Sequence, residues 1–349
     1  MTRENGADQV PAVSVVLPVL NEAQDIERLL LEVLNQVPPP GGFEVLVADG
    51  GSTDGTRAIV AGLAASWPSL TLLDNPKRLS SSGRNIGARA ARGKYLLYLD
   101  GHCFVPRSDY LLRLVELFET TGAACLCRPQ PLSYGAEGGW ARSIAAARHS
   151  WLGHAVGSDI YGGAPGFTDP RSAGAAYRSE VLVQLGGYDE RFDACEDVEF
   201  NCRVRMARLQ AYRHPDLEVG YRPRSTLPGL FRQLLRYGRG RAQVLAKHHH
   251  AVPWPLVSIT IITLTVLVSL VVRGPRLAGT MAALLAALWL AISGIEAIRT
   301  AKGLADGARI YASLLVIHTG LIVGFWRGLA EFARFRTREN SGAGLMRFG

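Results

Sequence analysis

The sequence predicts a Rossmann-like, doubly wound α/β domain with a mixed sheet, followed by C-terminal transmembrane helices. Hydrophobic runs of strand length alternate with helical segments over the first hundred residues, and polar residues follow several of these runs. Long apolar stretches dominate from about residue 256 onward. Strands this hydrophobic are buried on both faces, so the intervening helices must cross over and cover both sides of the sheet.

The predicted strands and helices follow one another in order. A β-branched run at 13–17 is closed by Pro18, and Asn21 can then cap a helix whose apolar positions recur at i, i+3, i+4, i+7 and i+8. Further strands are expected at 43–48, 70–73 and 94–99, and further helices at 56–65 and 82–91. A turn farther along leads into a helix that starts near Glu196.

Polar side chains gather where three of the predicted strands end. Glu22 follows the first strand, Asp49 ends the second, and Asp100 with His102 follows the fourth. Ligands of doubly wound sheets bind at the carboxyl ends of the strands, so these residues are expected in one site. Asp49 and its neighbour Asp54 can also be turn-forming residues, and Asp100-Gly can be a simple turn.

The composition favours a membrane over nucleic acid as the partner of the basic residues. The net charge is +8, 48% of the residues are hydrophobic, and the basic residues crowd just before the first apolar stretch without an interleaved aromatic platform. The five cysteines show neither a CxxC pair nor zinc-type spacing, which is typical of buried thiols in a reducing compartment. Because residues 1–13 lack an apolar signal-peptide core, the globular part is expected in the cytoplasm.

Three apolar segments, at 256–272, 277–298 and 310–326, are each about long enough to cross a ~30 Å hydrocarbon core. Basic residues before the first segment place the globular domain on the cytoplasmic side of a multi-pass protein of the inner or cell membrane. Three crossings would put the basic tail outside, so either the tail is an exception or one segment is re-entrant. The predicted division is a globular domain (1–225), a basic amphipathic interfacial helix (226–250), transmembrane segments (251–330) and a basic tail (331–349).

Five segments in order resemble the motifs of family 2 glycosyltransferases of the GT-A fold. They are PVLNE at 18–22, VADGGSTDGT at 47–56, GRNIGARAARGKYLLYLDGH at 83–102, GGYDE followed by ACEDVEF within 186–200, and QLLRY at 233–237. With its DGH triplet and apolar segments the chain is similar to membrane-bound exopolysaccharide transferases of the succinoglycan type. The resemblance covers about residues 12–245 and implies transfer of a sugar from a nucleotide-sugar, with a UDP-sugar as the expected donor, to a lipid-linked or polysaccharide acceptor.

The resemblance implies a donor site at the strand ends. Pro18, Glu22 and Asp49 would line the nucleotide pocket, with the carboxylate of Asp49 accepting from the uracil N3–H. Asp100 and His102 stand where the family has Asp-x-Asp, so they would hold a Mn²⁺ or Mg²⁺ ion on the diphosphate. Arg84 falls in the segment that approaches the donor phosphates, although a helix-surface arginine would fit the same pattern.

The resemblance also implies catalytic and acceptor residues. The Asp197 carboxylate would be the base that deprotonates the acceptor hydroxyl, and Glu196 its positioning neighbour; alternatively both are helix-start carboxylates that interact with the helix dipole. Gln233, Arg236 and Tyr237 resemble the family's Gln-x-x-Arg-Trp, found near the acceptor and pyrophosphate. Tyrosine in place of tryptophan favours single addition over processive synthesis, and an interfacial helix that binds lipid phosphate stays open as the alternative.

Two other functions remain open from the sequence. A polyprenyl-phosphate glycosyltransferase would use the same donor pocket with a simpler acceptor. A non-catalytic membrane scaffold that binds nucleotide-sugars would keep the pocket but not the turnover. The sequence does not define the donor sugar, the linkage, the metal, the oligomeric state or the number of membrane crossings.

Overall fold

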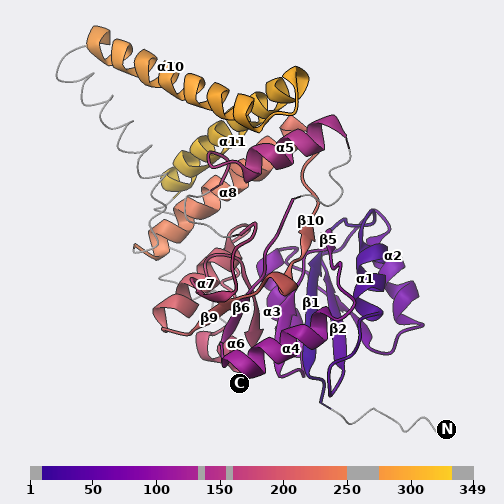
Figure 1. Cartoon of the computed structure of the whole chain (residues 1–349). Helices are drawn as coiled ribbons and strands as arrows, with labels where there is room; N and C mark the ends of the chain where they lie inside the picture. Colours follow the sequence, from indigo (N-terminus) through magenta and orange to yellow (C-terminus); the bar gives the residue numbers. More distant parts are fainter. Residues whose placement is uncertain (1–9, 133–137, 155–159, 250–274, 332–349) are drawn as a thin grey trace, which may run out of the picture. The chain divides into compact units, whose positions relative to one another are not determined.

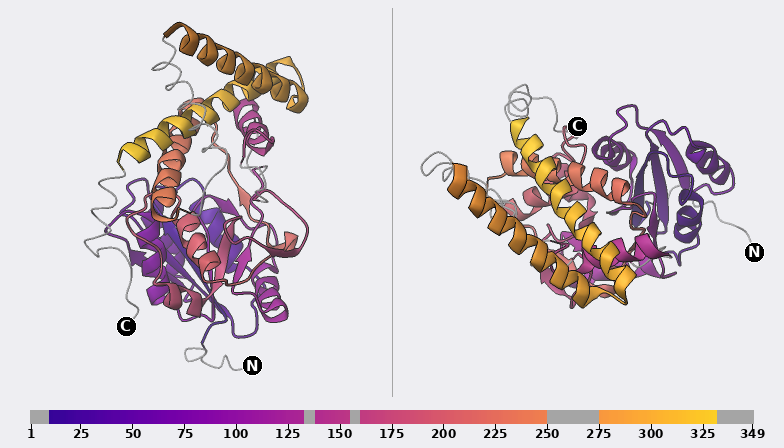
Figure 2. Two further views of the ribbon diagram at one scale, coloured as in Figure 1. Left: turned by 90° about the vertical axis from the view of Figure 1, so that its left-hand side faces the viewer. Right: turned by 90° about the horizontal axis from the view of Figure 1, so that it is seen from above.

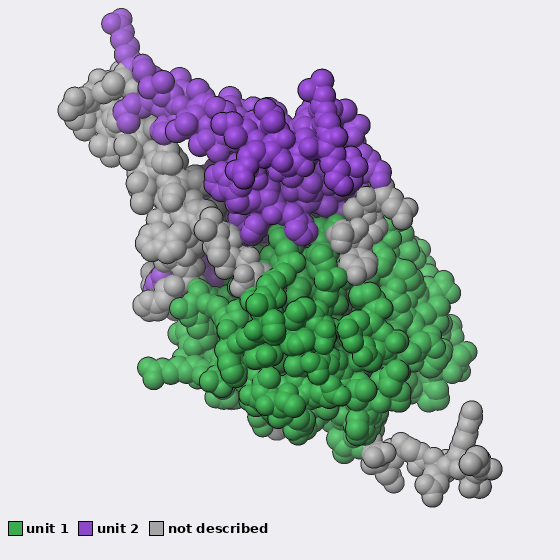
Figure 3. Space-filling view, viewed as in Figure 1, with its two compact units in different colours: residues 1–134, 159–222, 338–349 green, residues 135–158, 223–337 purple. Residues whose placement is uncertain are grey.

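The computed structural model describes residues 10–132, 138–154, 160–249 and 275–331 (Figure 1). These residues form two compact units (Figure 3). The first unit holds residues 10–132 and 160–222, and the second holds residues 138–154, 223–249 and 275–331. The division expected from the sequence, with boundaries at 225, 250 and 330, stays a prediction.

An eight-stranded mixed sheet forms the centre of the first unit, in the order β3-β2-β1-β4-β8-β6-β9-β7. The strands are β1 (Val13–Val19), β2 (Phe43–Asp49), β3 (Leu70–Asp74), β4 (Tyr95–Tyr98), β6 (Cys125–Cys127), β7 (Gly166–Thr168), β8 (Gly174–Arg178) and β9 (Ala211–Arg213). β1 pairs in parallel with β2 and β4, and β8 pairs antiparallel with β4 and β6. The strand order reverses at β1, which is the topological switch point where such sheets bind ligands.

Helices cover both faces of this sheet, as predicted for a doubly wound fold (Figure 1). α1 (Ile26–Leu34), α2 (Thr56–Ala64) and α4 (Tyr110–Thr121) contribute to one hydrophobic core, and α6 (Ser179–Leu185) and α7 (Glu196–Met206) contribute to the other. Side chains alternate along a strand, so Val15 of β1 enters the first core and Val16 enters the second. α3 (Ser80–Ala90) packs closely on β1, since a Cβ atom at Gly87 would lie 2.2 Å from Val16 Cγ1.

A small second sheet brings a distant segment to the end of β4. β5 (Cys103–Phe104) pairs antiparallel with β10 (Gly220–Tyr221), which follows the short 3₁₀ helix η1 (Pro215–Leu217). In this pairing Tyr221 lies opposite Cys103. The end of the first unit's chain is therefore held beside the residues that follow β4.

The predicted helix cap at Asn21 is wrong. α1 begins at Ile26 with Asp25 at the N-cap, and Asn21 has a left-handed φ of 57°. Its Oδ1 accepts a hydrogen bond from the Thr53 backbone N–H at 2.9 Å, and its own N–H donates to Ser52 Oγ at 2.9 Å. Asn21 thus joins the loop after β1 to the loop after β2 instead of starting a helix.

The second unit consists of α5 (Gly139–His149), α8 (Leu227–Lys247), α10 (Pro275–Thr300) and α11 (Leu304–Ala330). α11 runs alongside α8 (Figures 1 and 2). A Cβ atom at Gly324 of α11 would lie 2.1 Å from the Leu235 carbonyl oxygen of α8, and one at Gly238 of α8 would lie 2.3 Å from the Leu321 oxygen. Small residues allow the backbones of two helices to come this close, as in membrane helix pairs.

Two helices of the second unit are long and apolar enough to cross a membrane. The candidate spans are Gly279–Thr300, with 22 residues and a mean hydropathy of 2.0, and Leu304–Ala330, with 27 residues and a mean hydropathy of 1.6. They contain most of the apolar segments predicted at 277–298 and 310–326. The segment predicted at 256–272 lies outside the described residues.

Candidate active site

Asp100 lies just after β4 and is held from two sides. Its Oδ1 accepts a hydrogen bond from Arg84 Nη2 at 3.0 Å, and its Oδ2 accepts one from the Tyr221 hydroxyl at 2.8 Å. Burial favours the neutral carboxyl, but the interactions with Arg84, His102 and Arg128 outweigh it and lower the pKa of Asp100. The carboxylate is therefore ionised at neutral pH and fixed in direction.

Arg84 of α3 connects Asp100 to the start of α7. The side chain is buried, and its Nε lies 3.4 Å from Glu196 Oε1. The guanidinium also lies 5.5 Å from the ring centres of Tyr98 and Tyr188. Burial alone would lower the pKa of Arg84, but Asp100 and Glu196 raise it well above the usual value. Arg84 is thus a buried cation and not a helix-surface arginine.

Glu196 and Asp197 occupy the first turn of α7, as expected from the sequence. The preceding residue, Cys195, has a left-handed φ of 61°. Burial raises the pKa of the Glu196 carboxyl, with Arg84 opposing the shift. Asp197 is half-buried, and its Oδ1 accepts from the Val198 backbone N–H at 2.8 Å. The structure thus joins Glu196 to Asp100 through Arg84, while Asp197 bonds to its own helix.

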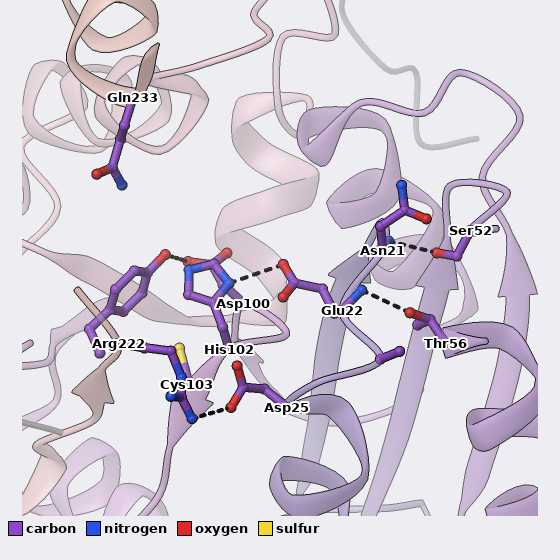
Figure 4. Close-up of polar contacts among 12 residues, drawn as sticks. Asn21, Glu22, Asp25, Ser52, Thr56, Asp100, His102, Cys103, Arg222 and Gln233 are labelled. Carbon is purple, nitrogen blue, oxygen red and sulfur yellow. Dashed lines mark hydrogen bonds and ion pairs between the residues drawn. The ribbon is translucent and has the colours of Figure 1, made fainter. Parts of the chain in front are cut away.

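Glu22 and His102 form a pair beside Asp100 (Figure 4). Glu22 Oε1 lies 3.0 Å from His102 Nδ1. The His102 ring meets the Tyr221 ring edge-on, with 4.6 Å between ring centres. Tyr221 also bonds to Asp100. Glu22, Asp100 and His102, which follow two different strands, therefore lie in one cluster, and Tyr221 completes it.

The Asp49 carboxylate supports the turn that follows β2. It is buried and accepts hydrogen bonds from Ser52 Oγ at 2.6 Å and from the Gly51 N–H at 3.2 Å, with Arg57 Nη1 at 3.3 Å. Asp54 also has a turn role, since it accepts from the Thr56 N–H at 3.1 Å. The predicted contact of Asp49 with a uracil base stays a prediction.

Pro18 lies in β1 on the side of α3. A Cβ atom at Gly83 of α3 would lie 2.8 Å from Pro18 Cβ. The absence of a side chain at Gly83 therefore lets α3 approach the end of β1. Arg84, the next residue, is carried on this closely packed turn.

Asp100 and His102 can form half of a cation site. Within the described ranges, no group of three or more His, Cys, Asp and Glu side chains is placed to hold a metal ion. Mg²⁺ in phosphate-processing sites is commonly bound by one or two carboxylates together with the substrate phosphates, and Mn²⁺ also accepts imidazole. One carboxylate and one imidazole thus fit a cation that is shared with a diphosphate, and do not fit a complete protein cage.

Gln233, Arg236 and Tyr237 lie on α8, in the second unit. Gln233 Nε2 donates to the Tyr237 hydroxyl at 3.3 Å, and Arg148 of α5 donates from Nη1 to Gln233 Oε1 at 3.4 Å. Arg236 is exposed. The structure therefore brings Arg148, which the sequence motifs did not indicate, to the Gln233–Tyr237 pair.

The sequence patterns also did not indicate two other residues of this site, Tyr221 and Arg128. Tyr221 follows Asp100 by 121 residues, and it reaches that carboxylate only because β10 pairs with β5. Arg128 follows β6 and is buried, with Nη1 lying 3.9 Å from Cys103 Sγ. No local pattern marks either residue, because both depend on pairing between distant strands.

Comparison with solved structures identifies the class of fold. The mannosyltransferase PcManGT from Pyrobaculum calidifontis, solved with GDP-Man and Mn²⁺, matches with a TM-score of 0.57 and 23% identity, over 91% of this chain and 87% of that one. The first unit is thus a GT-A-type glycosyltransferase sheet, as expected, and two long apolar helices follow it.

Comparison of sequences identifies the family. The model of glycosyl transferase family 2 matches residues 14–184. The succinoglycan biosynthesis protein ExoA of Rhizobium meliloti is 33% identical over 339 residues, which are 94% of this chain and 98% of that protein. A Methanococcus voltae protein, dolichyl N-acetyl-alpha-D-glucosaminyl phosphate 3-beta-D-2,3-diacetamido-2,3-dideoxy-beta-D-glucuronosyltransferase, is 23% identical over 252 residues, 69% of this chain and 76% of that protein. The chain belongs to glycosyl transferase family 2.

Proposed function

We propose that this glycosyltransferase inverts the anomeric configuration of a UDP-sugar as it transfers the sugar to a polyprenyl-linked or polysaccharide acceptor. The observation that carries the proposal is the Asp100–Arg84–Glu196 connection. It joins the residues after β4, which would face the donor diphosphate, to the first turn of α7, where the base would lie. Donor and catalytic groups are thereby held in one rigid arrangement.

On the donor side, Pro18, Glu22 and Asp49 belong to the strand ends that would receive the nucleotide. Asp100 and Glu196 raise the pKa of Arg84, whose guanidinium is always cationic and would also contact the donor diphosphate. The Pyrobaculum calidifontis mannosyltransferase with the similar fold was solved with GDP-Man and Mn²⁺, which supports a nucleoside-diphosphate sugar as the donor and a divalent cation. A UDP-sugar is the specific donor that we propose.

Transfer would proceed by one displacement. Asp197 takes the proton of the acceptor hydroxyl while the hydroxyl oxygen attacks the anomeric carbon from the face opposite the diphosphate. The bond between the anomeric carbon and the diphosphate oxygen breaks, and the nucleoside diphosphate leaves with the electron pair. Asp100 and His102 would hold a divalent cation, which would neutralise charge on the diphosphate. Glu196, held by Arg84, positions the first turn of α7.

The acceptor side is proposed at the membrane. α10 and α11 would anchor the enzyme, the basic helix α8 would lie at the interface, and its Gln233, Arg236 and Tyr237 would approach the acceptor. The Methanococcus voltae relative is named for transfer to a dolichyl-phosphate-linked sugar, which supports a lipid-linked acceptor. Such a substrate explains why the active site is attached to a bilayer, with the catalytic unit in the cytoplasm.

The test is nucleotide release by the purified full-length enzyme in nanodiscs, with a panel of UDP- and GDP-sugars and with Mn²⁺ or Mg²⁺. Each donor is offered either a lipid-linked saccharide fraction or a polyprenyl phosphate. We expect cation-dependent UDP release with one sugar and with the saccharide acceptor. Turnover on polyprenyl phosphate alone would identify the simpler acceptor. If the protein binds UDP but releases none from any UDP-sugar with either acceptor, the proposed enzymatic activity is contradicted and a non-catalytic scaffold is favoured.

A further inference from the structure

We propose that Glu22 is a positioning residue for His102. Its carboxylate selects the imidazole tautomer that presents Nε2 to a divalent cation held jointly with Asp100. The proposal rests on the proposed function, because that function assigns the cation to Asp100 and His102. It gives Glu22 a role toward the cation, in addition to its predicted place in the nucleotide pocket.

The contact between the two side chains determines the tautomer. Glu22 Oε1 lies 3.0 Å from His102 Nδ1. A carboxylate accepts hydrogen bonds, so this contact favours the tautomer that carries the proton on Nδ1. In the neutral ring the lone pair is then on Nε2, which becomes the nitrogen able to bind a cation. Carboxylates that accept from the second nitrogen of a metal-binding histidine fix its orientation and raise its basicity.

Glu22 itself is held in place by its surroundings. Its backbone N–H donates to Thr56 Oγ1 at 2.8 Å, and the next N–H, that of Ala23, donates to Asp54 Oδ2 at 3.0 Å. Gly101 packs against its side chain, since a Cβ atom there would lie 2.7 Å from Glu22 Cγ. The loop after β1 therefore delivers the carboxylate to His102 in a fixed position, which is the requirement for a positioning group.

Tyr221 supports the two proposed cation ligands together. Its ring packs edge-on against the His102 ring, and its hydroxyl donates to Asp100 Oδ2 at 2.8 Å. Glu22 and Tyr221 thus restrict His102 from two directions. A set that includes an imidazole favours Mn²⁺ over Mg²⁺, because Mg²⁺ prefers oxygen ligands only.

The experiment measures Mn²⁺ binding and the histidine tautomer separately from catalysis. Free Mn²⁺ is measured by electron paramagnetic resonance during titration of the full-length enzyme with saturating UDP. The variants are Glu22→Gln, His102→Ala and the control Glu27→Gln, on the exposed side of α1. The amide introduced by Glu22→Gln can offer either its oxygen or its N–H to the ring, so the tautomer is no longer fixed. We expect Mn²⁺ affinity to fall about 10- to 100-fold in Glu22→Gln and to be unchanged in Glu27→Gln.

Nitrogen-15 NMR of the metal-free enzyme, with labelled histidine, reports the tautomer directly. The His102 signals, identified by their loss in His102→Ala, are expected to show the Nδ1–H form in the wild type and a mixture in Glu22→Gln. Melting temperatures of all variants show whether each remains folded.

The outcomes separate this proposal from the proposed function. Suppose that His102→Ala weakens Mn²⁺ binding, but Glu22→Gln changes neither the Mn²⁺ affinity nor the His102 tautomer. The role of Glu22 is then overturned, while the cation site stands. If His102→Ala leaves Mn²⁺ binding unchanged, the assignment of the cation to His102 fails, and the positioning role fails with it. If Glu22→Gln loses UDP binding in the absence of metal while the His102 tautomer stays unchanged, Glu22 acts on the nucleotide and not through His102.

Discussion

At the scale of single residues, Arg84 is the side chain on which the described site most depends. It is a buried cation between the carboxylates of Asp100 and Glu196. Removing one partner of a buried ion pair leaves a charge in a medium that solvates it poorly. The guanidinium therefore has a structural role in addition to its proposed contact with the diphosphate.

We predict that Arg84→Met destabilises the first unit by roughly 3 kcal/mol, which corresponds to a fall in Tm of about 6–12 °C for a domain of this size. The matched control is Arg205→Met, whose guanidinium forms an exposed pair with Asp169. Exposed pairs contribute about 0–1 kcal/mol, so this variant should melt within about 4 °C of the wild type. Thermal unfolding of the full-length protein in detergent measures both; equal shifts would contradict the role of Arg84.

The same contacts predict how that stability depends on pH. The pKa of Asp100 is lowered in the folded protein, so its ionised form contributes stability that is present at neutral pH and lost as the pH falls below the ordinary range of an aspartate. The pKa of Glu196 is raised, and Arg84 limits this rise. In the wild type only the pKa of Glu196 is raised, whereas without Arg84 the pKa values of both carboxyls would be higher, so lowering the pH stabilises the variant more than the wild type.

We therefore expect the difference in Tm between the wild type and Arg84→Met to shrink as the pH falls from 7 to about 4. The measurement is a melting series at intermediate pH values. A difference that stays constant over this interval would show that the two carboxyls do not respond to Arg84.

At the residue level, the sequence indicated which polar side chains lie at the ends of strands, and their roles stay predictions. Asp49 and Asp100 follow hydrophobic strands, and parallel pairing brings those strand ends to one edge of the sheet. Tyr221 could not be found this way, because the β5–β10 pairing leaves no periodic signal in the sequence. The contact between Glu22 and His102 also depends on how two loops fold, and spacing does not encode that.

At the scale of elements, α11 shows how a pattern of small residues determines a helix contact. Gly320, Gly324 and Gly328 recur every four residues, and each faces α8 closely enough that a side chain would meet it. The spacing places all three on one stripe of the helix. The pair α8–α11 thus depends on the absence of side chains along this stripe.

We predict that Gly324→Leu separates α8 from α11, because its Cβ alone would lie 2.1 Å from the Leu235 oxygen. Overpacking of this kind costs about 1–3 kcal/mol or more. The control is Gly279→Leu on α10, where a Cβ atom meets nothing within 4 Å. The distance between spin labels at exposed positions of α8 and α11 measures the separation. An unchanged distance and Tm in Gly324→Leu would contradict the packing.

Most elements of the first unit were predictable from their patterns, and the exceptions have physical reasons. Runs such as 13–17 and 43–48 are β-branched and lie within β1 and β2. Asn21 was misassigned because it can cap a helix and can equally adopt the left-handed conformation of a turn. α5 was not predicted, because its small residues pack on α11 and give no regular apolar stripe in the sequence.

At the scale of the whole molecule, the second unit is the part that we propose attaches the chain to a membrane. Two of its helices are long and apolar enough to cross a bilayer. Exposed apolar side chains such as Leu284, at 66% exposure, and Ile298, at 78%, would be costly in water and stable in lipid. The sequence predicted these segments from length and hydropathy, but it did not predict that residues 138–154 group with them.

We predict that the full-length chain stays with the membrane fraction after an alkaline carbonate wash, which removes peripheral proteins. A chain held only by the basic helix α8 would be released, because that attraction is electrostatic and is weakened by salt and by high pH. Recovery of the chain in the supernatant would contradict the two spanning helices.

The most direct test of the proposed mechanism is the rate of sugar transfer by Asp197→Asn, measured together with its affinity for UDP. The control is Glu180→Gln, an exposed carboxylate in the first turn of α6. If Asp197 is the base, transfer falls by about 10²–10⁴-fold while UDP binding and Tm stay at wild-type values, and the control is fully active. Transfer at the wild-type rate in Asp197→Asn would show that another group takes the proton, and the proposed mechanism would be wrong.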